Sequence, residues 1–182
     1  MILTVSTSFP QGKSTGQSRF PLAIGDKLRQ TLIKISPEEA TFSKRGFLTT
    51  NPKIQQHLEA IGKTFLQGYE IAIAFNDPSR VIGQLNCIEA EYRGFAFEGA
   101  AMGLALLDRL TPWNCTRIEQ FLRDEGQNHI YMTYVGIGWL LARIPGGIQG
   151  YLRRLQQVGA KGPSPLQKLD PLLGWLAIDG YG

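Results

Sequence analysis

Pairs in which proline directly follows a serine, threonine, asparagine or aspartate constrain this chain more than any other sequence feature. Six of the ten prolines stand in such pairs, which are Ser36-Pro37, Asn51-Pro52, Asp77-Pro78, Thr111-Pro112, Ser164-Pro165 and Asp170-Pro171. The small polar side chain can accept a hydrogen bond from a free amide at a helix start, and proline has the φ angle of a first helical turn. The six pairs therefore predict helix starts, and Ser36 with Glu39 three residues later predicts a capping box.

From residue 36 onward these starts and the spacing of apolar residues predict a helical chain. We expect helices near 37–44, 52–75, 78–87, 90–110, 115–124, 129–144, 147–157 and 166–178. No segment convincingly alternates apolar and polar residues with the period of two that a half-buried strand needs. The sequence therefore predicts an all-α fold, a compact multi-helix bundle.

The longest expected helix, 52–75, carries one continuous apolar stripe. Its members follow one another at spacings of four, three, four and four residues, and they are Ile54, Leu58, Ile61, Phe65 and Tyr69. These spacings place all five side chains on one side of a helix. We expect this whole side to lie in the core.

Composition and length indicate one folded domain preceded by a basic extension. The chain of 182 residues is long enough to bury a core, and 43% hydrophobic against 19% charged residues is typical of globular proteins. Residues 1–45 hold seven Lys and Arg against three Asp and Glu, whereas the rest of the chain is balanced. We therefore expect a poorly ordered, Ser/Thr-rich extension over 1–35 and a single helical domain over 36–182.

The sequence argues against several classes of protein. The folded part shows no basic stripe with interleaved aromatic residues, so nucleic acid is not an expected partner. The longest apolar stretch, YVGIGWLLA, is too short for a membrane span of about 20 residues. Two cysteines without a C-x-x-C pattern and two histidines without an H-x-x-x-H or E-x-x-H spacing predict no metal site and no cofactor. The cysteines are consistent with a reducing compartment or with simple core packing.

Two of the expected helices are rich in small residues. EGAAMGLALL carries Gly99 and Gly103 one turn apart, and TYVGIGWLLA carries Gly136 and Gly138. A glycine inside a helix costs about 1 kcal/mol relative to alanine, so these positions should serve another purpose. One interpretation is close helix contact, because a missing side chain lets two backbones approach. The other is room for a ligand between these two helices.

Glu98 is an isolated carboxylate in the apolar run GFAFEGAAMGLALLD. Met102 and Ala105 share its helix face and cannot pair with it, so a partner must come from elsewhere in the fold. Burying an unpaired carboxylate costs several kcal/mol or forces it to protonate. The candidate partners are His129, Tyr131, Tyr134, Arg93 and Arg143. Glu98 belongs either to a structural network or to a site where a raised pKa lets it act as an acid or base.

These residues define a candidate site. The catalytic candidates are Glu98 and His129, which begins the second glycine-bearing helix and could relay a proton. The candidate ligand-binding residues lie on the same two helices, and they are Gly99, Met102, Gly103, Tyr131, Tyr134, Gly136, Gly138, Trp139 and Arg143. No nucleophile motif such as G-x-S-x-G accompanies them.

Six segments of the chain resemble one known family. They are KRGF at 44–47, FLQGY at 65–69, RGFAFEGAAM at 93–102, LLDRLTP at 106–112, HIYMTYVGIGWLLAR at 129–143 and DPLLGWLAIDGYG at 170–182. In this order they resemble the UnbL-type family of unknown function, which is encoded beside enediyne polyketide synthases. The resemblance covers about residues 36–182. Members of that family extend further, so the resemblance implies the first half of a longer architecture.

The resemblance implies a bacterial, cytoplasmic accessory protein of enediyne-like polyketide and antibiotic biosynthesis, and it assigns no residue roles. Three functions stay open. The first is binding or handling of an apolar polyene intermediate between the glycine-rich helices. The second is an enzyme in which Glu98 and His129 transfer protons on a polyketide-derived substrate. The third is a helical interaction scaffold that docks on a polyketide synthase, on another pathway protein or on a second copy of itself.

Overall fold

The computed structural model describes residues 33–156 and 173–182. The chain divides into two units, Met1–Ile33 and Lys34–Gly182, and all of the first unit except Ile33 lies outside the described residues. The same holds for the predicted helix starts at Ser164 and Asp170 and for the first part of the predicted helix 166–178. The second unit carries the features that follow.

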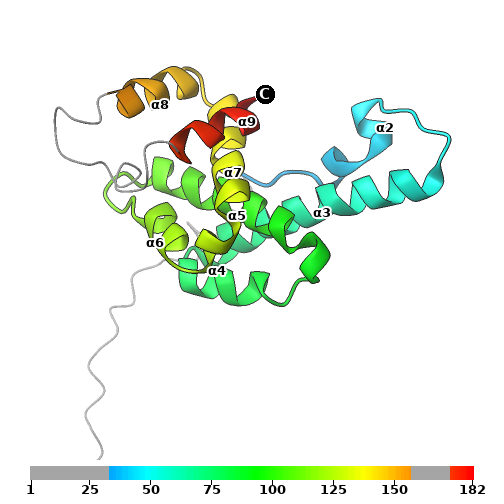
Figure 1. The fold of residues 1–182 in the computed structure, drawn as a ribbon, viewed down its shortest axis with the longest axis horizontal. Coiled ribbons are helices and arrows are strands. Elements are labelled where there is room, and N and C mark those ends of the chain that lie inside the picture. The colour runs from blue at the N-terminus through cyan, green and yellow to red at the C-terminus, as the bar shows by residue number, and fades with distance from the viewer. Residues whose placement is uncertain (1–32, 157–172) are drawn as a thin grey trace, which may run out of the picture. The chain divides into compact units, whose positions relative to one another are not determined.

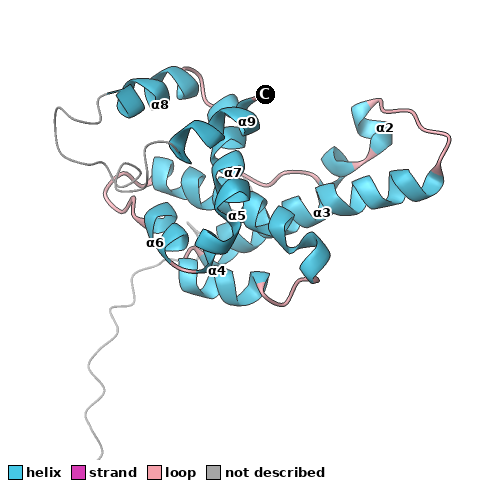
Figure 2. Cartoon of the chain, viewed as in Figure 1, coloured by secondary structure: helices cyan, strands magenta, loops and turns pink. Residues whose placement is uncertain are grey.

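The described part of the second unit consists of helices joined by loops, and it contains no strand (Figure 1, Figure 2). The helices are η1 (Pro37–Ala40), α2 (Phe42–Arg45), α3 (Pro52–Phe75), α4 (Pro78–Leu85), α5 (Ala90–Leu110), α6 (Arg117–Arg123), η2 (Glu125–His129), α7 (Ile130–Arg143), α8 (Gly147–Gln156), η4 (Leu173–Leu176) and α9 (Ala177–Tyr181). The predicted all-α fold is confirmed. The predicted ranges for α3 to α8 agree with the structure to within two residues at each end.

Three of the predicted helix starts are confirmed by hydrogen bonds from the capping side chain. Asn51 accepts the second and third amides of α3 at 3.1 and 3.4 Å. Asp77 accepts the third amide of α4 at 2.9 Å, and Ser36 accepts the second amide of η1 at 3.4 Å. Each of these contacts satisfies an amide that has no partner inside its own helix.

Two predictions about helix starts are wrong. Thr111 ends α5 instead of beginning a helix, because its amide and its hydroxyl both donate to the Leu107 carbonyl oxygen, at 2.9 and 2.7 Å. A threonine hydroxyl can close a last helical turn in this way as well as a first one. The capping box at Ser36 does not form, because the Glu39 carboxylate lies 3.4 Å from the Arg45 guanidinium instead. The predicted helix 37–44 is accordingly split into η1 and α2.

α5 packs against α3 and against α7, and α9 in turn packs against α7 (Figure 1). The middle of α5 is buried on every side; the buried residues there include Ala96, Phe97, Ala100, Ala101, Met102 and Leu104. A helix that is apolar all round must be covered all round to be stable. α4 and α6 complete the cover with Val81, Leu85, Phe121 and Leu122. The core of the unit is therefore centred on α5.

The apolar stripe of α3 is buried only in its second half. Tyr69 is buried and Ile61 and Phe65 are half-buried, whereas Ile54 and Leu58 expose 51% and 47% of their surface. The prediction that the whole stripe lies in the core is therefore wrong for the first two turns. Figure 1 shows the reason, which is that the first part of α3 extends beyond α5 and runs beside α2.

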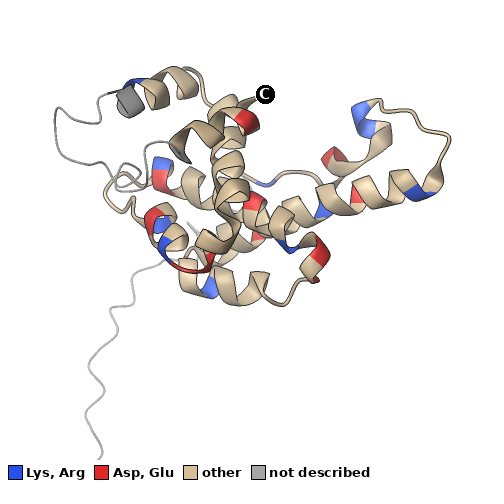
Figure 3. Cartoon of the chain, viewed as in Figure 1, with Lys and Arg blue, Asp and Glu red and all other residues tan. Residues whose placement is uncertain are grey.

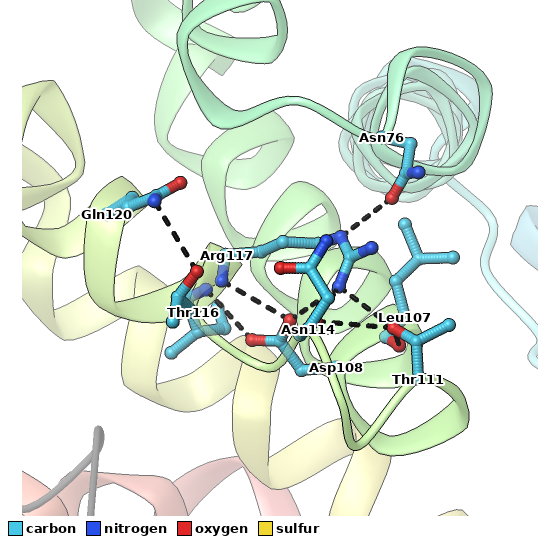
Figure 4. Close-up of polar contacts among 9 residues, drawn as sticks. Asn76, Leu107, Asp108, Thr111, Asn114, Thr116, Arg117 and Gln120 are labelled. Atoms are coloured by element: carbon cyan, nitrogen blue, oxygen red, sulfur yellow. Dashed lines mark hydrogen bonds and ion pairs between the residues drawn. The ribbon is translucent and has the colours of Figure 1, made fainter. Parts of the chain in front are cut away.

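A buried arginine joins α6 to the ends of α3 and α5 (Figure 4). The Arg117 guanidinium donates to four acceptors, which are the Asn76 side chain at 2.7 Å, the Asp108 carboxylate and the Thr111 hydroxyl at 3.0 Å each, and the Asn114 carbonyl oxygen. The Asp108 carboxylate also accepts two backbone amides at the start of α6. A buried charge is tolerated when it is paired and hydrogen-bonded in this way. The network therefore fixes the turn between α5 and α6 against α3.

Arg117→Lys is expected to lower the free energy of unfolding by about 2 kcal/mol. Lysine keeps the charge, but one ammonium group cannot reach acceptors on several sides, so at least one buried acceptor loses its partner. Urea unfolding followed by circular dichroism measures the change. Arg123→Lys on the same helix is the matched control, because Arg123 is exposed and a lysine can also pair with its partner Glu119 one turn earlier, so a change below about 0.5 kcal/mol is expected. An equal decrease in the free energy of unfolding of the two variants would show that the Arg117 network adds no more stability than an exposed arginine does.

Candidate functional site

Glycines on α5 and α3 bring the two helices into backbone contact. A Cβ atom at Gly99 would lie 1.8 Å from the Phe65 carbonyl oxygen of α3. In the opposite direction, a Cβ atom at Gly68 would lie 2.0 Å from the Ala96 carbonyl oxygen of α5. One turn beyond Gly99, a Cβ atom at Gly103 would lie 2.8 Å from the Cβ of an α3 alanine. These separations are shorter than real Cβ contacts, so α3 occupies the space that the glycines leave.

The glycines of α7 face two different helices. A Cβ atom at Gly136 would lie 2.0 Å from the Glu98 carbonyl oxygen of α5, and one at Gly138 would lie 2.0 Å from the Ala177 carbonyl oxygen of α9. Close helix contact is therefore the role of these glycines. The expectation of ligand room is corrected at four positions, which are Gly99, Gly103, Gly136 and Gly138. Helices of the same chain cover all four.

Glu98 is a buried acid whose side chain is hydrogen-bonded to an indole. It is 7% exposed, and its Oε1 accepts a hydrogen bond from Nε1 of Trp139 at 2.7 Å. It forms no ion pair with any residue that the structure describes. Burial raises the pKa of the Glu98 carboxyl to about 7, and the hydrogen bond from Trp139 lowers it only in part. The carboxyl therefore changes its protonation state near neutral pH.

The predicted partners of Glu98 are wrong, because its hydrogen-bond donor is Trp139. α7 crosses α5 at Gly136, and this crossing carries Trp139 over the Glu98 side chain. Arg93 instead donates to the Ile88 carbonyl oxygen at 3.1 and 3.0 Å. Arg143 lies over the Trp139 ring at 5.5 Å from its centroid and donates to the Trp139 carbonyl oxygen at 3.2 Å. The remaining candidates, His129, Tyr131 and Tyr134, have other surroundings.

The Glu98 side chain lines a pocket of about 300 Å³. The pocket is formed by η1 and α2, by the middle of α3, and by one stretch each of α5 and α7. Its lining consists of Ile35, Glu39, Ala40, Arg45, Ile61, Gly62, Phe65, Leu66, Phe95, Glu98, Trp139 and Arg143. Most of these residues are apolar or aromatic, and the charged ones besides Glu98 are at least partly exposed. A volume of this size and an apolar lining with a few polar groups are typical of small-molecule sites.

Trp139 connects the acid to the apolar lining of the pocket. Its indole N–H is bound to Glu98, its ring centroid lies 5.9 Å from that of Phe65, and the Arg143 guanidinium lies over the same ring. A cation over an indole face is an attractive arrangement. The side chain is therefore held in place from several sides, and its fluorescence is sensitive to any molecule that enters the pocket.

The structure brings together only part of the predicted site. Glu98, Trp139 and Arg143 line one pocket. The other eight predicted residues do not, and they are the four glycines and His129, Met102, Tyr131 and Tyr134. The His129 ring lies 4.3 Å from the Phe97 ring, and burial and the Arg93 guanidinium lower the pKa of its imidazole. The Tyr131 hydroxyl donates to Asp179 at 3.3 Å, and Met102 and Tyr134 are buried in the core.

A second cavity, of about 320 Å³, lies between the end of α5, the end of α7 and the start of α8. It is also lined in part by charged side chains, among them Asp108 and Arg109. The Asp108 carboxylate already accepts hydrogen bonds from the Arg117 guanidinium and from backbone amides. Glu98 has no such cation, so the pocket next to Glu98 is the better candidate for ligand binding.

Several residues of the Glu98 pocket were missed by sequence reasoning. Phe65 and Ile61 belong to the predicted core stripe of α3, and their half-buried state depends on where that stripe leaves the core. Phe95 precedes Glu98 by three residues on α5, so the same helix face could have suggested it. Glu39 and Arg45 come from η1 and α2, whose placement against α3 no local signal indicates.

The described residues contain neither a metal-binding cluster nor a membrane-spanning helix. No group of three or more His, Cys, Asp or Glu side chains there is arranged to hold a metal ion. None of the described helices combines the length and the apolar character needed to cross a bilayer.

Fold and site together define an all-α protein with a largely apolar pocket whose lining includes one buried acid, Glu98. Residues 24–182 match the model of DUF1702, a family described as protein of unknown function, and the chain belongs to this family. The match to this family model begins at residue 24, whereas the resemblance to the UnbL-type family covers about residues 36–182. Comparison with curated proteins and with solved structures finds no significant match in either.

Proposed function

We propose that this protein binds an apolar small molecule in the pocket next to Glu98. The observation that supports the proposal is a buried carboxyl without a cationic partner in an otherwise largely apolar lining. Below pH 7 this carboxyl is mostly neutral, so an apolar ligand can displace water without leaving a buried charge. The protonated carboxyl can also donate a hydrogen bond to an oxygen atom of the ligand.

The ligand in this proposal is a conjugated polyene with a polar or anionic end. Phe65, Phe95 and Trp139 offer aromatic surfaces to a flat unsaturated chain. Arg45 and Arg143 line the same pocket and suit a carboxylate at the end of such a chain. The resemblance to the UnbL-type family favours a polyketide-derived polyene, and an accessory role beside a polyketide synthase in a bacterial cytoplasm belongs to the same proposal.

A polyene fatty acid tests the proposal directly. trans-Parinaric acid is expected to quench Trp139 fluorescence in a saturable manner at sub-millimolar concentration, because the indole lines the pocket. The chain has three tryptophans. Trp113→Phe together with Trp175→Phe therefore leaves Trp139 as the single emitter. Absence of saturable quenching in this concentration range would overturn the proposal.

Two glutamate substitutions on α3 form a matched control. Ile61→Glu adds a carboxylate to the pocket and is expected to weaken binding of parinaric acid at least about tenfold, since it adds charge to an apolar lining and repels the ligand. Ile54→Glu lies two turns earlier, is exposed and does not line the pocket, so binding is expected to stay unchanged. Equal weakening by both substitutions would show that the fatty acid binds elsewhere on α3.

Proton transfer by Glu98 is a second candidate function. A pKa near 7 suits a group that must both accept and donate a proton at neutral pH. His129 does not line the pocket, so this alternative involves Glu98 without His129. Chromatography and ultraviolet absorption of a polyene recovered from the protein distinguish isomerisation or cyclisation from simple binding, because the products keep the mass of the polyene and differ in retention and conjugation.

A further inference from the structure

The loop between α2 and α3, residues 46–50, presents two apolar side chains to solvent. Phe47 is 61% exposed, and Leu48, at 98%, is more exposed than any other large hydrophobic side chain that the structure describes. Ile54 and Leu58, on the first turns of α3 shortly after this loop, are exposed as well, at 51% and 47%. We name the set formed by Phe47, Leu48, Ile54 and Leu58 the α2–α3 tip. Apolar side chains gathered on a surface in this way mark an interaction site.

Hydrogen bonds hold the backbone of the tip in one conformation. Gly46 has a φ angle of 69°, and the Phe47 amide donates to the Phe42 carbonyl oxygen at 3.0 Å, which closes the end of α2. The Phe47 ring meets the Phe42 ring edge-on, with 5.6 Å between centroids. Glu59 on α3 accepts the Phe42 amide at 3.0 Å and so ties α2 to α3. The exposed Leu48 therefore directly follows a turn whose backbone is fixed by hydrogen bonds.

The charged residues within the stretch that carries the tip are basic, and acidic residues flank that stretch at Glu39 and Glu59. Between residues 40 and 58 the chain contains Lys44, Arg45 and Lys53 and no Asp or Glu. Figure 3 shows these basic residues on α2 and at the start of α3, on both sides of the loop. Glu39 lies 3.4 Å from Arg45 and 3.9 Å from Lys44 and offsets part of their charge, whereas Lys53 has no carboxylate partner among the described residues. An apolar loop bordered by cations is complementary to a surface that combines acyl chains with negative head groups.

We propose that the α2–α3 tip docks on an anionic lipid surface. Phe47 and Leu48 enter the boundary between head groups and acyl chains, while Lys44, Arg45 and Lys53 contact lipid phosphates. A lipid surface fits the tip better than a protein partner does. A stable protein interface takes about 20–30 residues on each side, whereas the tip has four apolar side chains, and only Phe47 and Leu48 lie on the loop itself.

The tip adjoins the pocket next to Glu98. Arg45 ends α2 directly before the loop, and both Arg45 and Glu39 line the pocket. Docking through the tip therefore brings this pocket close to a lipid surface, where apolar molecules concentrate. The lipid proposal rests on the exposure and charge of the tip, so it holds whether or not the pocket contains a ligand.

Vesicle sedimentation of the full chain tests the tip. The protein is expected to sediment with vesicles of equal parts phosphatidylglycerol and phosphatidylcholine, and less so at high salt, because salt screens the contact with anionic lipid. Phe47→Ser combined with Leu48→Ser is expected to lower the partition coefficient at least about tenfold. Trp113→Ser is the matched control, since Trp113 is 82% exposed in another loop, and it should leave the partition unchanged.

A fluorescent label reports on the tip itself. The basic residues of 1–35 are the same in every variant. They therefore cannot explain a difference in vesicle binding between the Phe47/Leu48 double serine variant and Trp113→Ser. Leu48→Cys, labelled with NBD in a chain that also carries Cys87→Ser and Cys115→Ser, is expected to shift its emission to the blue on addition of vesicles. The same label on Trp113→Cys should not shift. Equal sedimentation of the wild type and the double serine variant, or unshifted emission at position 48, overturns the proposal.

Discussion

Gly99→Ala is expected to lower the free energy of unfolding by about 4 kcal/mol or more. The added methyl group would lie 1.8 Å from the Phe65 carbonyl oxygen, so α3 and α5 would have to move apart. Moving α5 away from α3 pushes it towards α7, where the Glu98 carbonyl oxygen is already in contact with Gly136. Because domains of this size are stable by about 5–15 kcal/mol, the substitution removes a large part of the native stability.

Gly83→Ala is the matched control for this prediction. Gly83 lies within α4 and is exposed, and no atom lies within 4 Å of the position where its Cβ would be added. Alanine is expected to raise the free energy of unfolding there by about 0.5–1 kcal/mol, because glycine is the poorer helix former. Urea unfolding of both variants measures the two changes. A stabilising effect of Gly99→Ala would show that α3 and α5 are not in backbone contact.

Helix positions could be predicted because their signals are local. The caps at Asn51 and Asp77 involve only amides within three residues of the capping side chain. Thr111 shows the limit of such signals. Its hydroxyl donates back to Leu107 and closes α5, and the same residue type could have opened a helix. Whether Thr111 closes one helix or opens another depends on the Arg117 network, which joins α6 to Asn76 at the distant end of α3 as well as to Thr111.

The burial of the α3 stripe could be predicted only in part. The spacing correctly places Ile54 and Leu58 on the same side of α3 as Tyr69. Whether a turn of that side is covered depends on where the neighbouring helices end, and no property of α3 itself determines this. The exposed first turns, which belong to the proposed lipid-docking tip, therefore became visible only in the structure.

Glu98 could be singled out, but its partner could not. A lone acid in an apolar run is visible in the sequence, whereas the donor Trp139 lies 41 residues away on another helix. Its position over Glu98 follows from the crossing of α5 and α7 at Gly136. His129 begins the same region of the chain but lies about two turns before this crossing, and there it meets Phe97. The glycines were correctly identified as unusual, although they contact backbone and not a ligand.

The close contacts and the raised pKa of Glu98 have one physical origin. Gly99 brings α3 against α5, and Gly136 brings α7 against the backbone of Glu98 itself. The side chains of Phe65 and Trp139, which these contacts position, line the same pocket as the carboxyl, which is only 7% exposed. With little contact with water and no cation paired with it, the ionised form is disfavoured and the proton is held up to about pH 7.

Glu98→Gln is therefore expected to stabilise the protein at pH 8 and to leave it nearly unchanged near pH 4.5. The unfolded chain releases this proton near pH 4.5, whereas the native carboxyl holds it up to about pH 7. Between these values the native state binds more protons than the unfolded state, so wild-type stability falls as the pH rises. Above pH 7 both states are ionised and the full penalty, about 3 kcal/mol, remains. Glutamine has no charge to bury and can still accept the hydrogen bond from Trp139.

Urea unfolding of both proteins between pH 4.5 and pH 8.5 measures this difference. Glu91→Gln is the matched control, because Glu91 is exposed on the first turn of the same helix and does not line the pocket. Its effect on the free energy of unfolding is expected to stay within about 0.5 kcal/mol across the range. The decisive observation is how the difference between the two free energies of unfolding changes with pH. An ion pair at Glu98 would make the glutamine variant the less stable protein at pH 8. A difference that is the same at both ends of the range would show that the carboxyl ionises as freely in the native state as in the unfolded chain.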